Sequence, residues 1–561
     1  MKQELEYVVS KVCMELFNVD VSVELTRPDE QFGDYATSVA LQLGQQLNKN
    51  PREIAEKIAS KLKHKKIAGT EVAGPGFINI KIQSNLLAMW LFEETKLRVF
   101  GRSDLGQGRK VVCEFPSPNM AKPVSVGHLR AAVQGWTIYK LMTHLGYEVV
   151  TDNHIGDYGT PFGKWVVGFL YFSSDEKLAK DGIYELARIY IEITAALKTE
   201  KEQGDDKLAG EVQGWLKKLE AKDVDAVEYS NRFNKISLDH LHKVMGRLRI
   251  STDHELGEAF YVPRGQALTD ELLKKGIAKE SDGALVVPLD DAGIDTPIML
   301  RKANGTALYA TTDLATIEYR QQQWNPEKVF IHTGQEQTFY FRQLKALAKK
   351  VGYKDVIEHL WHGLIDQKDE DGTRQKMSSR KGVVLLEELL DVAEKKARKQ
   401  MKDGNEEDIK AVALGAIKFA DFTADRKKGM LFDWESMFSV QGFSGPAVQY
   451  AVVRIKSVLA KATDSKPNDI SDYDWQAEHA LLLLATDFPQ LLVELGKNYE
   501  MHKLATYLYG LARELNRYYE ETQILITKEP IRGYRLWFIT VIRDILVDGL
   551  DILGIPTPER M

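Results

Sequence analysis

Residues 116–130 read PSPNMAKPVSVGHLR, and this stretch decides the fold of the chain. The apolar residues 111–113 precede it, and a run with apolar residues three and four apart follows over 129–145. A second apolar run at 147–150 completes the order strand, helix, strand, which predicts a βαβ unit of a parallel sheet. The quoted stretch then forms the turn into the helix, where free backbone N–H groups and the helix dipole bind phosphate.

A basic loop appears much later in the chain, where residues 376–382 read KMSSRKG. It lies between two apolar runs, GLI at 363–365 and VVLL at 383–386, which predict short strands. Cations in a loop rich in Ser and Gly suit the triphosphate of ATP. A solvated basic turn is the alternative, which the first motif and the position after the sheet disfavour.

The two motifs resemble the signatures of class I aminoacyl-tRNA synthetases, His-x-Gly-His and Lys-Met-Ser-Lys-Ser. Longer strings resemble the arginyl-tRNA synthetase family in particular: EFPSPNMAKPVSVGHLR (114–130), NHIGDYGTPFG (153–163), ALYATTDLA (307–315), GFSGPAVQYAVVRI (442–455) and the terminal PERM (558–561). The resemblance begins at FGDYA (32–36) and GPGFIN (74–79) and extends to the last residue. Several ordered blocks are far more specific than a lone Gly-His-Leu.

The composition is that of a soluble globular protein, with 44% hydrophobic and 28% charged residues. No apolar run reaches the length of a membrane span and the N-terminus lacks a signal segment, so we expect a cytoplasmic protein. The two cysteines, Cys13 and Cys113, are too few for a disulfide framework or a thiolate zinc site. A net charge of −6 argues against a generally basic nucleic-acid binder but leaves room for a local basic surface that binds tRNA.

A chain of 561 residues predicts about three domains. Residues 1–105 mix helix and strand patterns and predict an N-terminal α+β domain, which the resemblance places on the D-loop side of tRNA. Residues 106–385 alternate strands and helices and predict a Rossmann-like parallel-sheet catalytic domain, with a helical insertion at about 173–245. Residues 386–561 are nearly all helical and predict a C-terminal all-α helix bundle, which the resemblance identifies as the anticodon-binding domain.

The reaction that the resemblance implies joins L-arginine to tRNA(Arg) through an adenylate made from ATP. A carboxylate attacks the α-phosphate in line, so the protein positions the reactants and stabilises charge. The catalytic residues are then Lys122, Ser125, His128 and Lys376. The ATP-binding residues are Ser117, Asn119, Gly127, His128, Lys376, Met377, Ser378, Arg380 and Lys381. No His/Cys cluster has metal-ligand spacing, so Mg2+ is expected to arrive with ATP.

The chain departs from both signatures. Ser125 stands where the first signature has a histidine, and a hydroxyl donates a hydrogen bond but carries no charge. Either the serine suffices or another cation, Lys122, supplies the charge. Ser379 stands where the second signature has its second lysine, with Arg380 and Lys381 directly after it. His128 could instead be only a helix cap, which the flanking motif disfavours.

The amino-acid pocket has to bind a planar guanidinium, for which carboxylates are the natural partners. The resemblance assigns to it Glu114, Asn119, His154, Tyr309, Asp313 and Gln337, with Gln335 as an alternative to Gln337. Glu114 ends the first strand, at the sheet edge where ligands bind. Tyr309 and Asp313 are predicted to face one site around a strand-to-helix turn, although Asp313 could instead cap a helix at 314–323.

Contacts with tRNA are expected from aromatic and amide side chains. The resemblance places Phe77 and Asn79 at the D-loop corner, and the alternative is a strand with a buried phenylalanine. Gln449, Tyr450 and Arg454 are expected on one helix face, where they either meet tRNA or pack the bundle. The predicted partners are tRNA(Arg), L-arginine and ATP, with no membrane, and we expect a monomer.

Two other functions remain open at this point. One is a small-molecule adenylating ligase or nucleotidyltransferase, which would not need so long a helical tail. The other is a tRNA-binding relative whose catalysis has decayed, an idea that rests on Ser125 and Ser379. His128, Lys376 and the expected guanidinium pocket argue against it.

Overall fold

The computed structural model describes residues 2–97, 100–120, 122–302, 309–368, 374–376, 384–401, 404–462 and 467–561. The chain forms two compact units. The first contains Met1–Ser103, Tyr450–Asn498 and Thr506–Gly549, and the second contains Asp104–Gln449, Tyr499–Ala505 and Leu550–Met561. Within the described ranges, none of the helices combines the length and the hydropathy that crossing a bilayer requires.

A four-stranded parallel sheet forms the centre of the second unit, in the order β10-β9-β4-β5. Its strands are β4 (Lys110–Glu114), β5 (Glu148–Asp152), β9 (Lys328–Ile331) and β10 (Ile357–His359). Helix α5 (Leu129–His144) connects β4 to β5, which confirms the predicted βαβ unit. Chain order reverses direction between β4 and β9, and open parallel sheets bind ligands at the carboxyl side of such a point.

Helices follow β5 without any intervening strand: α6 (Thr160–Phe172), α7 (Asp175–Asp181), α8 (Ile183–Glu202), α9 (Lys207–Glu220), α10 (Val224–Arg247) and α11 (Glu258–Lys274). An antiparallel sheet then interrupts the alternation, formed by β6 (Lys279–Ser281), β7 (Ala284–Leu289) and β8 (Ile294–Arg301). This sheet packs on α12 (Tyr309–Trp324) and α13 (Thr338–Val351) around a core that includes Leu285, Leu300 and Leu314. The all-parallel pattern predicted for this region is therefore incomplete.

Strand β12 (Arg374–Lys376), which directly precedes most of the basic loop in the sequence, belongs to a small mixed sheet. Strands β11 (Ile365–Lys368) and β12 are antiparallel, and β13 (Met430–Phe432) runs parallel to β11. The strand predicted at 383–386 is wrong over its described residues, because Val384 lies in no element, Leu385 forms only an isolated bridge with Ser125, and Leu386 begins α14 (Leu386–Gln400). Its buried residues recur at helical spacing: Leu386, Leu389, Leu390, Ala393 and Ala397. Helices α15 (Glu406–Asp421) and α16 (Trp434–Met437) follow.

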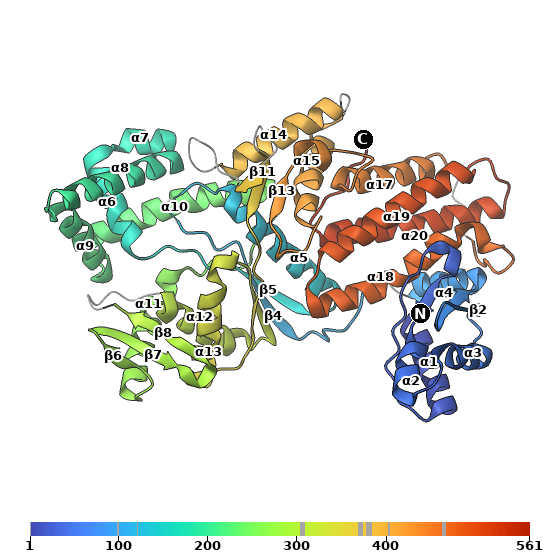
Figure 1. Ribbon diagram of the computed structural model, residues 1–561. Coiled ribbons are helices and arrows are strands. Elements are labelled where there is room, and N and C mark those ends of the chain that lie inside the picture. The colour runs from blue at the N-terminus through green and yellow to red at the C-terminus, as the bar shows by residue number, and fades with distance from the viewer. Residues whose placement is uncertain are drawn as a thin grey trace. The chain divides into compact units, whose positions relative to one another are not determined.

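The first unit joins an N-terminal α+β part to helices from the end of the chain (Figure 1, blue and red). Its sheet, in the order β1-β3-β2, is antiparallel. The N-terminal elements are α1 (Lys2–Phe17), β1 (Tyr35–Thr37), α2 (Val39–Leu47), α3 (Pro51–Lys61), β2 (Ile67–Ala73), β3 (Phe77–Ile82) and α4 (Ser84–Leu97). The later helices are α17 (Gly445–Leu459), α18 (His479–Asn498), α19 (His502–Glu521) and α20 (Ile531–Ile552). The fold class predicted from the sequence, an α/β catalytic part with an N-terminal α+β part and C-terminal helices, is thus confirmed.

Candidate active site

A cavity of about 350 Å³ opens where β4 and β9 end, at the reversal of strand order. Residues that follow these strands line it, among them His332 after β9. Six predicted site residues also line it: Ser117, Asn119, Ser125, Gly127, His128 and Gln337. Residues far apart in the sequence therefore meet in one hollow of the size that small ligands occupy.

His128 ends a short 3-10 turn, Val126–His128, directly before α5. Its Nδ1 accepts the backbone N–H of Ser125 at 3.2 Å, and the Ser125 hydroxyl lies 3.2 Å from the same nitrogen. A backbone N–H can only donate, so the neutral ring carries its proton on Nε2. Burial and the positive charge of Lys122 lower the pKa of His128, which keeps the ring neutral at pH 7. His128 thus caps the turn through Nδ1 and keeps a donor on Nε2.

Replacing Ser125 by alanine tests whether its hydroxyl serves the nucleotide. The backbone N–H that fixes the His128 ring stays, so the variant removes only the Oγ contact. We expect slower adenylate formation by the equivalent of about 0.5–1.5 kcal/mol, with tRNA binding unchanged, and we expect Ser125→His to be tolerated. Rapid-quench adenylation and filter binding of tRNA measure the two effects. Normal adenylation in Ser125→Ala would make the serine a spacer.

Of the other predicted phosphate ligands, Lys122 is the one whose side chain the structure describes. Lys122 is exposed and does not line the cavity, and its Nζ lies 5.4 Å from the centre of the Tyr190 ring. Lys376 ends β12, where its backbone pairs with Asp366, and its side chain lies outside the description. The predicted ligands Met377, Ser378, Arg380 and Lys381 are outside the described residues.

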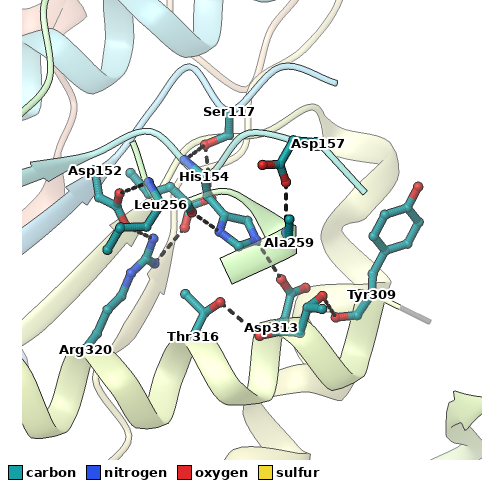
Figure 2. A network of polar contacts seen from close by, with 12 residues as sticks. Ser117, Asp152, His154, Asp157, Leu256, Ala259, Tyr309, Asp313, Thr316 and Arg320 are labelled. Carbon is teal, nitrogen blue, oxygen red and sulfur yellow. Dashed lines mark hydrogen bonds and ion pairs between the residues drawn. The ribbon is translucent and has the colours of Figure 1, made fainter. Parts of the chain in front are cut away.

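A polar network lies beside the cavity (Figure 2). Glu114, the last residue of β4, is bound to the buried Arg320 of α12 at 2.6 Å. Arg320 also binds Asp152, the last residue of β5, at 2.7 Å. Ser117 donates its hydroxyl to Glu114 at 3.3 Å and accepts the backbone N–H of His154 at 3.2 Å. The carboxylate predicted to meet substrate is therefore already paired with an arginine of the chain, and Ser117 links the network to the cavity.

Asp313 occupies the middle of this network. It lies inside α12, as Tyr309 does, so the predicted strand-to-helix turn between them and the alternative of Asp313 as a helix cap are both wrong. His154 donates Nδ1–H to the carbonyl of Leu256 at 3.1 Å, and its Nε2 lies 3.5 Å from Asp313. Burial disfavours the charged ring, but Asp313 and Glu114 outweigh it and raise the pKa of His154 to about 9. The Tyr340 hydroxyl donates to the other oxygen of Asp313.

Glu258, the first residue of α11, was not found from the sequence because a lone acid at a helix start is an ordinary first-turn residue. It is buried, and burial together with the charge of Asp313 raises its pKa to about 8. Asp157 also has a raised pKa, mainly from burial. Glu258 and Tyr309 line a second cavity, of about 460 Å³, and Tyr309 is 57% exposed. A buried group of acids beside an open cavity is suited to bind a cation.

The predicted tRNA residues are placed unevenly. Phe77 is 41% exposed, so the alternative of a buried phenylalanine is wrong, whereas Asn79 is buried. Gln449 is fully buried and donates to the carbonyls of Ala411 and Pro556. It packs inside the second unit rather than sharing an exposed face with Tyr450, which is 38% exposed. Arg454 donates to Asn516 at 2.7 Å. In the part of the chain that the structure describes, no cluster of His, Cys, Asp or Glu could hold a metal ion.

Three family models cover most of the chain. Residues 93–434 match "tRNA synthetases class I (R), catalytic domain", residues 448–561 match "DALR anticodon binding domain", and residues 1–82 match "Arginyl tRNA synthetase N terminal domain". The chain is 35% identical over 537 residues to the arginine–tRNA ligase of Lactococcus lactis subsp. lactis strain IL1403, covering 93% of each sequence.

Two solved structures resemble the chain over its whole length. The arginyl-tRNA synthetase of Thermus thermophilus matches with a TM-score of 0.81 and 25% identity, covering 100% of both chains. The enzyme of Plasmodium falciparum matches with a TM-score of 0.80 and 22% identity, covering 100% of this chain and 99% of that one, which shows a shared fold.

Proposed function

The chain belongs to the arginyl-tRNA synthetase family, and we infer that it is an arginine–tRNA ligase. It activates L-arginine with ATP to arginyl-adenylate and transfers the arginyl group to the 3′ end of tRNA(Arg), releasing AMP and pyrophosphate. The observation that supports this best is the placing of the His128 cavity beside the acidic group of Asp313 and Glu258, with Ser117 between them. One side suits phosphate and the other suits a guanidinium.

The ATP end of the site would use the backbone turn before α5 and the proton on His128 Nε2. As pyrophosphate leaves, charge on the phosphate oxygens grows, and a fixed neutral donor stabilises that charge without itself being rearranged. We propose Lys122, Lys376, Arg380 and Lys381 as the cations that accompany it. Mg2+ would enter bound to ATP, held mainly by phosphates and water.

The arginine end would use Asp313 as the carboxylate that pairs with the guanidinium, with Tyr309 and Gln337 at its borders. Glu114 and Asp152 are paired with Arg320, and His154 lies beside Asp313. Burial and the charge of Asp313 keep the proton on Glu258. An arriving guanidinium supplies a cation in a buried place, where a charge-assisted hydrogen bond is strong. Glu258 is thus proposed as a second carboxylate for the substrate.

Arginine binding is expected to depend on pH through Glu258. Without bound arginine, the Glu258 carboxyl has its pKa raised to about 8. A guanidinium bound beside it lowers this pKa, so arginine binding favours the ionised carboxylate and releases a proton. Affinity should therefore be highest above pH 8 and weaken as the pH falls below it, by up to about tenfold per unit. Titration calorimetry from pH 6.5 to 8.5 in two buffers measures both effects. Glu258→Gln should flatten the slope, and a pH-independent affinity in the unaltered protein would refute this assignment.

Pyrophosphate exchange separates this function from the alternatives. We expect weak exchange with ATP and arginine alone, restored by tRNA(Arg), including tRNA whose 3′ end cannot accept arginine. The physical reason is that remote tRNA contacts can order the catalytic loops before chemistry. Robust exchange without tRNA would show an ATP site that is already organised. A small-molecule ligase would show the same exchange with and without tRNA, and a tRNA-binding relative without catalysis would show no exchange at all.

We also propose that the enzyme acts as a cytoplasmic monomer. Light scattering of the purified protein tests its oligomeric state.

A further inference from the structure

The C-terminal segment, Leu550–Met561, folds into the second unit although helix α20 before it lies mostly in the first. The helix ends in a Schellman motif, in which the N–H of Gly554 reaches the carbonyl of Asp551 and that of Ile555 reaches Leu550, both at 2.8 Å. This motif requires the left-handed backbone found at Gly554, with φ of +68°. The turn directs the chain end onto the catalytic unit, where Leu553 and Ile555 are buried.

Three polar side chains of the catalytic unit bind the backbone of this segment. Lys418 donates to the carbonyl of Gly554 at 2.6 Å, Gln449 donates to that of Pro556 at 2.6 Å, and Asp408 accepts the N–H of Glu559 at 2.7 Å. All three side chains are buried: Asp408, Lys418 and Gln449. Leaving such groups without partners would cost free energy, so the segment is held in one place.

The same segment contacts helix α5, whose first residue directly follows His128. Asp551 pairs with Lys140 of α5 at 3.1 Å. A Cβ atom at Gly554 would lie 2.6 Å from Cδ1 of Trp136, so Trp136 packs directly against this glycine. The Trp136 ring also meets the edge of Phe115 with centroids 6.4 Å apart, in the loop that leads from Glu114 to Ser117. Through Trp136, Gly554 is thus connected by packing to both ends of the loop 115–128: to Phe115 at its start and to helix α5 after His128.

We propose that the C-terminal segment positions helix α5, and with it His128, for adenylate formation, and that Gly554 and Lys418 are positioning residues for this step. The proposal rests on the proposed function of His128. A donor that acts on the transition state loses its effect when it is displaced by about 1 Å, which can cost up to roughly a hundredfold in rate. The segment would then act in catalysis, although it lies within residues 448–561, which match the anticodon-binding domain.

Two matched glycine variants test the proposal. Gly276 ends α11 in the same Schellman motif with φ of +70°, but nothing lies within 4 Å of a Cβ built on it. Gly554→Ala and Gly276→Ala therefore share the cost of left-handed backbone, and only the former displaces Trp136. The assay is arginine-dependent pyrophosphate exchange with tRNA(Arg), normalised to active sites and run well below the unfolding temperature of each variant.

For Gly554→Ala we expect kcat about tenfold below that of Gly276→Ala, with KM for ATP within twofold. Adding Trp136→Phe to Gly554→Ala, which makes room for the methyl group, should restore part of kcat. Equal kcat in both glycine variants would overturn the proposal. It would mean that Gly554, like Gly276, contributes only to the stability of the protein. If Gly554→Ala fails to fold, Lys418→Met replaces it, and an unchanged kcat there also overturns the proposal. An unaltered enzyme without exchange would instead refute the proposed function.

Discussion

His128→Asn is expected to slow adenylate formation by roughly 10²–10³-fold, the loss that follows removal of one donor to a developing oxyanion. Asparagine places its side-chain oxygen near the position of Nδ1, so the hydrogen bond from the Ser125 N–H can persist. The variant therefore removes the Nε2 donor and keeps the cap. Because the contact forms in the transition state, kcat should fall while KM for ATP and arginine changes little.

The control for this result is His128→Gln, whose amide reaches toward Nε2 but loses the cap. Single-turnover adenylation with tRNA(Arg) present measures both variants. If the Nε2 donor matters, His128→Gln should retain more activity than His128→Asn. If only the hydrogen bond that caps the turn matters, His128→Gln should retain less. Near-normal adenylation in His128→Asn would reduce His128 to a capping residue.

Asp313→Asn is expected to weaken arginine use by about 1.5–3 kcal/mol, or roughly 10- to 150-fold in kcat/KM for arginine. The amide keeps the shape of the carboxylate and removes its charge, so the guanidinium loses an ionic hydrogen bond. The exchange rate against arginine concentration measures the effect, and KM for ATP should stay within about twofold.

Citrulline is the matched control for Asp313, because it replaces the guanidinium by a neutral urea of similar shape. The unaltered enzyme should prefer arginine strongly, and Asp313→Asn should narrow that preference. An unchanged arginine dependence would leave Asp313 with a structural role only, holding Tyr340 and the charged ring of His154.

The spacing of apolar residues predicted the βαβ unit of the catalytic part, because that unit is formed by neighbouring segments of the chain. The alternation around residues 116–130 predicted β4, α5 and β5 because strand and helix periods differ. Strand order in the sheet was out of reach, since β9 pairs with β4 across a long stretch of chain. The antiparallel sheet of β6, β7 and β8 was missed because short apolar runs are ambiguous between parallel and antiparallel pairing.

The candidate site divides in the same way. Motif residues such as His128 and Asn119 were found because they lie in one strand-to-helix turn, whose local sequence indicates a phosphate site. Arg320, Tyr340 and Glu258 were missed because each comes from a helix whose local sequence shows only an ordinary polar position. For Gln449 the sequence left tRNA contact and packing open, because an amide on a helix gives no sign of whether it is buried, and the burial found in the structure favours packing. Only the tertiary structure shows which charges share a buried region.

The most direct test of the account is transfer of labelled amino acids to tRNA(Arg) by the purified protein with ATP and Mg2+. The account predicts that arginine is esterified to the tRNA and that lysine and citrulline are not. It also predicts that the product forms far more slowly in His128→Asn, and more slowly in Asp313→Asn at low arginine. Failure to form arginyl-tRNA under conditions in which the protein is folded and binds tRNA(Arg) would contradict it, as would equal transfer of arginine and citrulline.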